Sequence, residues 1–416
     1  MPNERKFHMR PCLLGILLLA ASNIRAQVHP VEIPQGRKPS SSVRSAGVDA
    51  GDYVYLSGQG AQRPDGSVPD KFEEQASQAL ENIKTIVEAA GLDLEHVVYV
   101  QVYLEDVSNY QKLNEVFAKY FPTTPPARAV LGVSRLSPSS IQINAVAVRD
   151  LTGRKAVTPP NYKSTEPFSP GILTHDRLFV SAMQGRDPLT STVPDDPAAQ
   201  TDFALDGLKA VVEAAGLNLG HMVFVNPYLT QKIPMRVMNE HYARRFEFGN
   251  TPARATIEVA ALPNNAQIEY TGVAVRDLSL RRAVRPKNMP PSPTASPCVF
   301  AGATLYCSAK SGFIPGPNGG VYAATTAAQL RQTMRNQLDN LEEASMDFSQ
   351  VVSTTVYLDT LSDTEAFNKV YAEYFKATLP AQTVVQQLPS SSRSPDAEGH
   401  FPDLEQMSLV AVKRTL

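Results

Sequence analysis

A threefold internal repetition constrains the fold of this 416-residue sequence more than any other feature. The stretch 251–276 opens with Pro-Ala before Arg254 and continues into β-rich runs, and a near-copy opens with Pro-Ala before Arg128. A third, more divergent copy opens with Pro-Ala before Gln382. Arg128 precedes Arg254 by 126 positions, and Arg254 precedes Gln382 by 128. Regular spacing with matching local sequence indicates repeated structural units that pack against one another.

The repeats divide the chain into three similar domains. We place repeat 1 at 27–150, repeat 2 at 160–277 and repeat 3 at 290–416, with an insertion at 390–403 that is rich in Ser, Pro and Asp. Hydrophobic periodicity predicts the element order β-β-α-β-α-β-β in each repeat, with about 125 residues per unit. A chain of this length is too long for one ordinary core, in agreement with several domains.

The two amphipathic helices of each repeat favour one particular arrangement. Both helices need to cover the same face of a single sheet, and the opposite face is also apolar. The other two sheets are the obvious cover for that second face. The sequence therefore predicts an α+β protein in which three tandem domains form an intramolecular pseudo-trimer, with sheets inside and helices outside, in a chain that is itself a monomer.

The stretch 251–276 is predicted to be a hairpin of two strands joined by a turn at Leu262–Asn265. Two charged residues interrupt its packing-type sequence, Arg254 at the start of the first strand and Glu269 inside the second. A carboxylate flanked by apolar residues is costly to bury unless it is paired or used in chemistry. These two residues are therefore candidates for a functional site.

The first 26 residues have the features of a cleaved secretory signal. Lys6 and Arg10 precede the apolar run 13–21, and Ala26 offers a small residue for cleavage. The run is too short to span a bilayer, although an uncleaved interfacial anchor is the alternative. We expect an exported protein, periplasmic or extracellular, that has no membrane contact after cleavage.

Removal of the signal would leave Cys298 and Cys307 as the cysteines of the chain. A hairpin turning at Gly302-Ala303 would place them directly opposite each other. A disulfide in an oxidising compartment and two separate thiols are both open interpretations. The spacing is not that of a zinc site, and the seven histidines do not cluster, so no metal site is proposed.

Composition and charge argue against a polyanionic partner. The chain is 43% hydrophobic and 19% charged, as is typical of a globular protein, and its net charge is −2. There is no block of like charges. Neither nucleic acid nor an anionic membrane surface is expected as a partner.

The words PARA…IEVAALP…IEY…VAVR, with IKTIVEAAGL and YLSGQ, resemble the Rid/YjgF (RidA-like) family of reactive-intermediate deaminases. The resemblance covers the chain after the signal, three times over. It implies chorismate-mutase-like domains, which in the family assemble as trimers with a cleft between neighbouring subunits. It also implies hydrolysis of 2-imino or enamine acids to 2-oxo acids and ammonia, without a metal or cofactor.

Site residues follow from the resemblance position by position. Arg254 would grip the substrate carboxylate, and Glu269 would direct the attacking water and exchange its proton. Substrate-binding positions would be Ser181, Phe168 and Asn239 in repeat 2, and Arg128, Ser57 and Asn114 in repeat 1. The residue types suit this task, because a guanidinium offers two parallel donors to a carboxylate and water attack needs a proton acceptor.

The other repeats are incomplete at the same positions. Gln142 stands where repeat 1 should carry the glutamate, and repeat 3 has Gln382 for the arginine and Gln406 for the glutamate. Glutamine can hold a water but cannot take its proton at neutral pH. Either Arg254 and Glu269 share one cleft, or the cleft draws on two repeats and pairs Arg128 with Glu269.

Three functions are consistent with the sequence. The first is an exported imine or enamine deaminase. The second is a non-catalytic protein that binds a small carboxylate-bearing molecule, which export favours, because the unstable substrates of the family arise inside cells. The third is an endoribonuclease, disfavoured by the acidic charge balance and the absence of paired catalytic histidines in the sequence.

Overall fold

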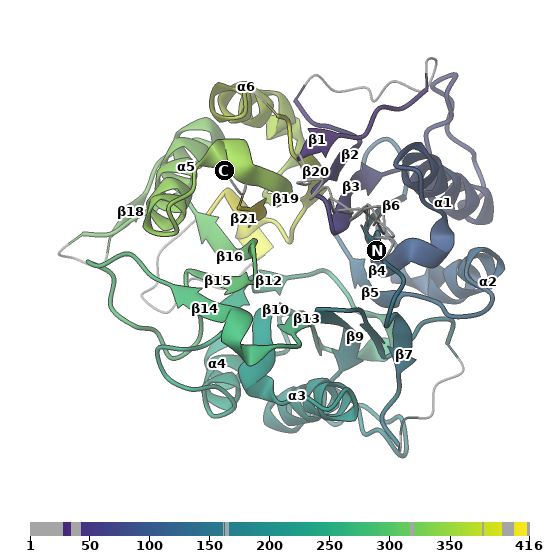
Figure 1. The fold of residues 1–416 in the computed structure, drawn as a ribbon, viewed down its shortest axis with the longest axis horizontal. Helices are drawn as coiled ribbons and strands as arrows, with labels where there is room; N and C mark the ends of the chain where they lie inside the picture. The colour runs from purple at the N-terminus through teal and green to yellow at the C-terminus, as the bar shows by residue number, and fades with distance from the viewer. Residues whose placement is uncertain are drawn as a thin grey trace, which may run out of the picture.

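The computed structural model describes residues 28–34, 43–160, 162, 166–316, 320–376, 378–392 and 403–413. The predicted signal at 1–26 lies outside the described residues, as does most of the predicted insertion at 390–403. Figure 1 shows three sheets around a common centre, with the six α-helices on the periphery. The predicted α+β architecture, with sheets inside and helices outside, is confirmed.

Repeat 1 contains a six-stranded sheet with two helices packed on its outer face. The sheet order is β1-β2-β3-β6-β4-β5. Its elements are β1 (His29–Pro30), β2 (Gly47–Asp49), β3 (Tyr53–Gln59), α1 (Phe72–Ala89), β4 (Val97–Leu104), α2 (Tyr110–Tyr120), β5 (Ala127–Gly132) and β6 (Ile141–Val148).

Repeat 2 has the same plan in a seven-stranded sheet. Its path is β11-β10-β13-β9-β8-β7, with β12 also paired to β10. Its elements are β7 (Lys155–Val157), β8 (Gly171–Leu173), β9 (Arg177–Gln184), α3 (Pro197–Ala214), β10 (Met222–Leu229), α4 (Met235–Ala243), β11 (Ala253–Arg254), β12 (Ile257–Glu258) and β13 (Ile268–Val275).

Repeat 3 again contains a six-stranded sheet, ordered β14-β15-β16-β21-β19-β20, and a separate two-stranded sheet. Its elements are β14 (Arg281–Val284), β15 (Cys298–Ala301), β16 (Thr304–Ser311), β17 (Phe313–Ile314), β18 (Val321–Tyr322), α5 (Thr326–Glu343), β19 (Val351–Leu358), α6 (Thr364–Tyr374), β20 (Ala381–Gln386) and β21 (Glu405–Val412). The edge strands β7 and β14 lie between the predicted domain ranges, in segments that the sequence pattern had not marked as strands.

The inner faces of the three sheets share one core. Its members come from all three repeats and include buried aromatic and β-branched side chains. Among them are Val48, Tyr55, Val98, Ile172, Phe179, Val223, Val299, Tyr306 and Val352. The outer face of each sheet has its own core under its two helices. Both faces of each sheet are thus buried, as the apolar strand sequences require.

The first helix of each repeat shows how the sequence specifies these elements. In α1 the predicted apolar stripe is buried, with Leu80, Ile83 and Val87 packed toward the sheet. The helix ends before Gly91, whose φ of +74° is the left-handed conformation that favours glycine at this position. The equivalent Gly216 has a φ of +78°. None of the described helices has the length and apolar character that a membrane crossing requires.

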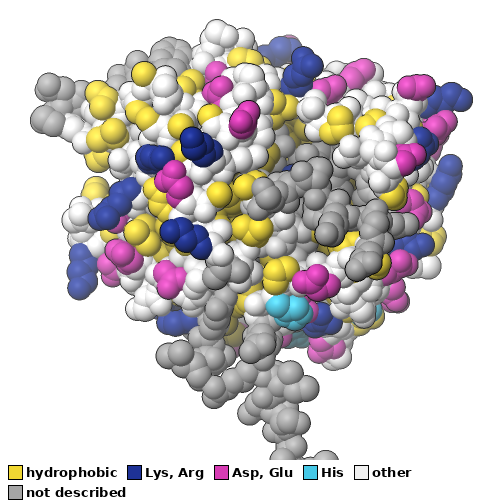
Figure 2. Space-filling view, turned by 90° about the horizontal axis from the view of Figure 1, so that it is seen from above, with side chains coloured by type: hydrophobic (Ala, Val, Ile, Leu, Met, Phe, Trp, Pro, Cys, Tyr) yellow, Lys and Arg dark blue, Asp and Glu magenta, His cyan; other side chains and the backbone are white. Residues whose placement is uncertain are grey.

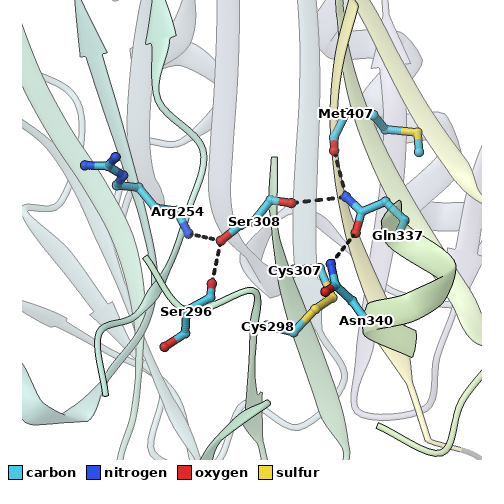
Figure 3. The surroundings of a disulfide bond; sticks show 8 residues. All are labelled: Arg254, Ser296, Cys298, Cys307, Ser308, Gln337, Asn340 and Met407. Atoms are coloured by element: carbon cyan, nitrogen blue, oxygen red, sulfur yellow. Dashed lines mark hydrogen bonds between the residues drawn. A yellow bond between two sulfur atoms is a disulfide. The ribbon is translucent and has the colours of Figure 1, made fainter. Parts of the chain in front are cut away.

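The two cysteines of repeat 3 form a disulfide (Figure 3). Cys298 on β15 is directly opposite Cys307 on β16, with the Cα atoms 4.0 Å apart. This geometry settles the alternatives left open by the sequence in favour of the bridge. Both residues are buried beneath α5.

Removal of this disulfide is expected to lower the stability of repeat 3. The bridge closes a loop with a sequence separation of 9, so the double variant Cys298→Ala/Cys307→Ala should lose up to about 3 kcal/mol of unfolding free energy. Urea unfolding followed by circular dichroism, with and without reductant, measures this loss. Reductant should shift only the wild type, and an equal shift in the variant would contradict the assignment.

Repeat 3 also has polar residues between its first helix, α5, and its sheet, at positions that are apolar in repeats 1 and 2. Thr333, Gln337, Asn340 and Glu405 replace Ala204, Leu208, Val211 and Ile268 of repeat 2. The Thr333 hydroxyl donates to Glu405 Oε1, while Glu405 Oε2 has no hydrogen-bond partner among the described residues. Burial raises the pKa of Glu405 to about 8.

Restoring the repeat 2 pair through Thr333→Ala/Glu405→Ile is expected to stabilise the protein above pH 5. Because the folded state binds the Glu405 proton more tightly than the unfolded state, this residue's stabilising effect is lost as pH rises from about 4.5 to about 8. The advantage of the variant should therefore grow by about 1 kcal/mol per pH unit in this window. Urea unfolding at pH 5, 6, 7 and 8 measures it, and a pH-independent difference would contradict the prediction.

Candidate functional site

A serine in each repeat joins that repeat to its neighbour through the same hydrogen bond. The Arg128 N–H donates to Ser181 Oγ at 2.7 Å, and the Arg254 N–H donates to Ser308 Oγ at 2.8 Å. The third contact is equivalent, from the N–H of Gln382 to Ser57 Oγ at 2.8 Å. We call these contacts seam 1–2, seam 2–3 and seam 3–1, after the repeats that they join. The predicted substrate-binding residues Ser57 and Ser181 therefore hold repeats together.

A cavity of about 580 Å³ lies at seam 1–2 and is formed by both repeats. Repeat 1 contributes Tyr110, Arg128 and Val130 to its wall. Repeat 2 contributes a larger part of the wall, including Glu166, Phe168, Ala182, Met183, Gln184, Phe203, Pro263 and Glu269. The structure thus brings Arg128, Phe168 and Glu269 together, as in the second of the two pairings that the sequence allowed.

The guanidinium of Arg128 is held in a fixed position, and one of its nitrogens has no hydrogen-bond partner among the described residues. Its Nη2 donates to Asn114 Oδ1 at 2.6 Å and to the Tyr110 hydroxyl at 3.3 Å. Its guanidinium lies 4.7 Å from the ring centre of Phe117 and 5.2 Å from that of Phe168. Nη1 is buried and lacks a hydrogen-bond partner within the described part of the chain. A buried donor without an acceptor is costly, so this nitrogen is suited to a ligand oxygen.

Glu269 on β13 is fully buried and is only weakly hydrogen-bonded. Gln184 Nε2 donates to its Oε2 at 3.4 Å, and Oε1 has no partner among the described side chains and backbone groups. Burial raises the pKa of Glu269 to about 8, and the negative charge of Glu166 adds to the rise, which Gln184 and Arg128 partly oppose. The carboxyl group is therefore largely protonated at neutral pH.

The structure corrects the predicted pairing of Arg254 with Glu269. Residues 251–276 are not a simple hairpin, because β10 lies between the strands that carry the two residues. β11 and β12 run parallel to β10 on one side, and β13 runs antiparallel to it on the other. Arg254 is level with Gly272, not with Glu269. Two strand spacings separate their strands by about 10 Å, before the offset along the sheet is counted.

Arg254 lies instead at seam 2–3, where its backbone meets Ser308 (Figure 3). Its Nη1 donates to Asn239 Oδ1 at 2.8 Å, and its guanidinium lies 5.1 Å from the ring centre of Tyr242. This is the arrangement of Arg128 with Asn114, repeated one seam further on. Arg254 and Asn239, both predicted for one site with Glu269, thus contact each other, but Glu269 lies elsewhere, in the cavity at seam 1–2.

The strand register identifies the residue at the glutamate position of each repeat. Glu269 is opposite Tyr228, Gln142 is opposite Tyr103, and Gln406 is opposite Tyr357. The alignment of Gln406 with Glu269 is therefore confirmed despite the insertion before it. At seam 1–2, Arg128 of repeat 1 lies across from Glu269 of repeat 2, so this seam has both the arginine and the glutamate.

Seam 3–1 has neither group at the equivalent positions. Gln382 replaces the arginine, and its Nε2 has no partner among the described residues. The Oδ1 of Asn368, in the position of Asn114, is likewise without a hydrogen bond to any described residue. The shorter glutamine side chain leaves this donor and this acceptor unpaired.

Sequence reasoning missed most of the cavity wall at seam 1–2, including three polar residues that act on Arg128 or Glu269. Tyr110 precedes Asn114 by one helical turn on α2, and this spacing places both side chains on one face. Gln184 ends β9 and is paired with Glu269 across the sheet. Glu166 lies between β7 and β8 of repeat 2. No group of His, Cys, Asp and Glu in the described residues is arranged to hold a metal ion.

The fold defines a class of protein in which three α+β units surround a common centre, with a cavity between two neighbouring units. A family model described as endoribonuclease L-PSP matches residues 38–149, 159–276 and 288–391. The chain belongs to this family, also known as RidA/YjgF, and carries three tandem copies of its domain. The resemblance seen in the sequence is thereby confirmed.

Several curated relatives each match about one repeat. RutC family protein SSO3206 of Saccharolobus solfataricus is 47% identical over 94 residues, which are 22% of this chain and 75% of that protein. Protein DfrA of Myxococcus xanthus is 37% identical over 127 residues, 30% of this chain and 95% of its own. The provisionally named reactive intermediate deaminase TdcF of Escherichia coli K12 is 37% identical over 108 residues, 25% of this chain and 84% of its own.

Solved structures show the same coverage. RidA from the Antarctic bacterium Psychrobacter sp. PAMC 21119 is 36% identical and covers 28% of this chain and 97% of its own, with a TM-score of 0.27. Escherichia coli TdcF with bound serine is 35% identical and covers 28% of this chain and 98% of its own, with a TM-score of 0.27. The family thus includes proteins named as deaminases of reactive intermediates.

Proposed function

We propose that this protein is an exported hydrolase that converts 2-imino or enamine acids to 2-oxo acids and ammonia in the cavity at seam 1–2. One observation carries the proposal. Arg128 and Glu269 line one cavity, and the buried atoms Arg128 Nη1 and Glu269 Oε1 have no hydrogen-bond partner among the described residues. A ligand that joins a carboxylate to a basic nitrogen, with a water beside it, satisfies both groups.

Arg128 is suited to bind the carboxylate of such a ligand. Its Nη2 is fixed by Asn114, so the free Nη1 has a defined direction. The rings of Phe117 and Phe168 keep water from the guanidinium and strengthen a charge-assisted hydrogen bond. The cavity volume of about 580 Å³ accommodates a small acid with a side chain.

Glu269 is suited to move a proton in both directions. With its pKa raised to about 8, it begins neutral and can protonate the imine nitrogen, which makes the imine carbon more electrophilic. The carboxylate so formed accepts a proton from the water that attacks this carbon. A new C–O bond forms and the C=N bond becomes single, which gives a carbinolamine. The proton taken from water then goes to the nitrogen, and the C–N bond breaks as ammonia leaves. The C=O bond of the 2-oxo acid forms at the same time, and the hydroxyl proton returns to Glu269, which is neutral again. An enamine substrate first takes a proton at carbon and enters the sequence as the imine.

The charges around the cavity favour this small acid over RNA. Its lining includes the acidic side chains of Glu166, Asp187, Asp206, Glu213 and Glu269, against those of Arg128 and Arg186. On the face drawn in Figure 2, basic and acidic side chains are interspersed and do not form a single basic patch. A polyanion gains little from such a surface.

Two features of the chain support export from the cytoplasm. The apolar run at 13–21 after Lys6 and Arg10 is the pattern of a secretory signal. The bridge between Cys298 and Cys307 is of the kind that persists in oxidising compartments. A reporter enzyme fused after residue 40 and assayed in periplasm and medium tests export, and retention of the reporter in the cytoplasm would contradict it.

A hydrolysis assay on the purified chain tests the activity. Imino acids are generated in place by an amino-acid oxidase, and 2-oxo acid and free ammonia are followed together. We expect release above the spontaneous rate, with the two products in equal amounts. No acceleration, combined with binding of small carboxylates in a calorimeter, would overturn hydrolysis in favour of a binding protein. Cleavage of RNA in a parallel arm would favour the endoribonuclease description.

A further inference from the structure

A second cavity, of about 360 Å³, lies on repeat 1 beside seam 3–1. Its wall includes Arg44, Arg63 and Gln142. Ser45, which follows Arg44, forms an isolated bridge with Ala381 of repeat 3 and thus places Arg44 at the seam. The residues around it are the repeat 1 equivalents of the repeat 2 residues that line the cavity at seam 1–2, but the side chains differ.

Arg44 occupies the position in repeat 1 that Phe168 occupies in repeat 2. The seam serine of each repeat donates to the carbonyl of Ser45 in repeat 1 and of Ser169 in repeat 2, so the residues before these two are equivalent. Phe168 faces the guanidinium of Arg128 across seam 1–2. At seam 3–1 the arginine is therefore on repeat 1, at the position of Phe168. The position of Arg128 is taken there by Gln382 of repeat 3.

The charge of Arg44 is not compensated by any described residue. Arg44 is half-buried and forms no hydrogen bond or ion pair with any residue in the described part of the chain. No aspartate or glutamate among the described residues lines the cavity, and the other cation there, Arg63, is already 3.9 Å from Glu74. Burial lowers the pKa of Arg44, because its guanidinium leaves water without gaining a carboxylate neighbour. An anion in the cavity would supply that neighbour.

Gln142 adds a second recognition group to the same cavity. Its side chain is 8% exposed, and its Oε1 has no hydrogen-bond partner among the described residues. Gly58 leaves room for this side chain, since a Cβ at that position would come within 2.6 Å of Gln142 Oε1. An acceptor buried in this way requires a donor, such as a hydroxyl or an amino group of a ligand.

We propose that this cavity is a second, non-hydrolytic binding site for a small carboxylic acid that carries a hydroxyl or amino group. Arg44 holds the carboxylate through parallel N–H donors, and Gln142 Oε1 accepts a hydrogen bond from the hydroxyl or amino group. The site does not hydrolyse its ligand, because a glutamine stands where Glu269 stands in repeat 2 and cannot exchange a proton with water. It is thus a candidate site for an effector.

Isothermal titration calorimetry with lactate tests this second site. The background is the double variant Arg128→Ala/Arg254→Ala, which removes the guanidinium groups at the other two seams. We expect this background to bind about one lactate per chain, and we expect the further change Arg44→Phe to weaken binding at least tenfold. Phenylalanine is chosen because it occupies the equivalent position in repeat 2. No lactate binding by the background would overturn the proposal.

Two controls separate recognition from general damage. Arg236→Ala removes an exposed arginine of repeat 2 and should leave lactate binding unchanged in the same background. Gln142→Leu should bring lactate binding down to that of propionate, which lacks the hydroxyl, while propionate binding persists. Circular dichroism and thermal midpoints confirm that each variant is folded. Unchanged lactate binding in folded Arg44→Phe and Arg44→Ala variants would also overturn the proposal, whatever the outcome of the hydrolysis assay.

Discussion

Replacing Glu269 by glutamine is expected to lower kcat for 2-oxo acid release by about 10²- to 10⁴-fold. The amide can still hold a water in place, but it can neither protonate the imine nor take the proton of the attacking water. Binding of the substrate carboxylate by Arg128 does not depend on this proton, so KM should change much less than kcat. The measurement is a steady-state assay of the variant at pH 7, with ammonia and 2-oxo acid followed separately.

Glu405→Gln is the matched control for this variant. Glu405 is also a fully buried glutamate whose pKa is raised to about 8 by burial, but it contacts Thr333 under α5, outside the cavity at seam 1–2. We expect kcat for this variant to stay within about twofold of the wild type. If both variants lost activity equally, the effect would come from a change in a buried charge and not from proton transfer.

The pH dependence of kcat/KM gives a second test of the role of Glu269. Its neutral form starts the reaction, and its pKa is about 8, so kcat/KM should be flat below that pH and fall about tenfold per unit above it. The residual activity of the Glu269→Gln variant should lack this fall. A variant with the wild-type rate and profile would move the proton transfer to another group of the cavity, such as Glu166.

The fold was predictable from the sequence because the repetition is visible in short matching words. The run 205–216 matches the run 80–91, and this match identifies the first helix in both repeats. The glycine that ends each run predicts where the helix stops. Two amphipathic helices per unit predict which face of the sheet they cover. The arrangement around an axis then follows from the need to bury the second apolar face.

The pairing of the site residues could not be predicted in the same way. A local reading of 251–276 treats two strands next to each other in sequence as a hairpin, and this is wrong because β10 inserts between them. β11 forms parallel pairs with β10, which are long-range contacts that leave no signal in the local sequence. The functional pairing of Arg128 with Glu269 spans two repeats and depends on how the sheets meet. The sequence could offer it only as one of two alternatives.

The exchange between Arg44 and Phe168 was hidden for a related reason. Both residues precede a strand, and the sequence match beside them is limited to a short Ser-x-Gly, at 45–47 and at 169–171. Their equivalence becomes visible through the hydrogen bonds of Ser57 and Ser181 to the carbonyls one residue further on. A backbone contact, not a sequence pattern, thus reveals the change in the wall of seam 3–1.

Arg128→Ala is expected to lower kcat/KM for 2-oxo acid release by about 10²- to 10³-fold, whereas Arg254→Ala should leave it within about twofold. Loss of a charge-assisted hydrogen bond to a carboxylate costs about 1.5–3 kcal/mol, and the guanidinium also orients the substrate toward Glu269. Arg254 has the same helix asparagine contact as Arg128, but its seam presents Gln406 where the acid should be. The two variants therefore remove the same kind of group from a complete and an incomplete site.

The comparison must separate lost recognition from lost packing, since Arg128 is 2% exposed and contacts Phe117 and Phe168. Arg128→Lys keeps the charge and most of the volume but lacks the planar group that donates to Asn114 from one nitrogen and to the ligand from the other, so it should remain folded and still lose most of the activity. Arg254→Lys is its partner control. If Arg254→Ala abolished hydrolysis while Arg128→Ala did not, the reaction would take place at seam 2–3. Glu269 could then not be its acid, because that residue lies on the other side of β10.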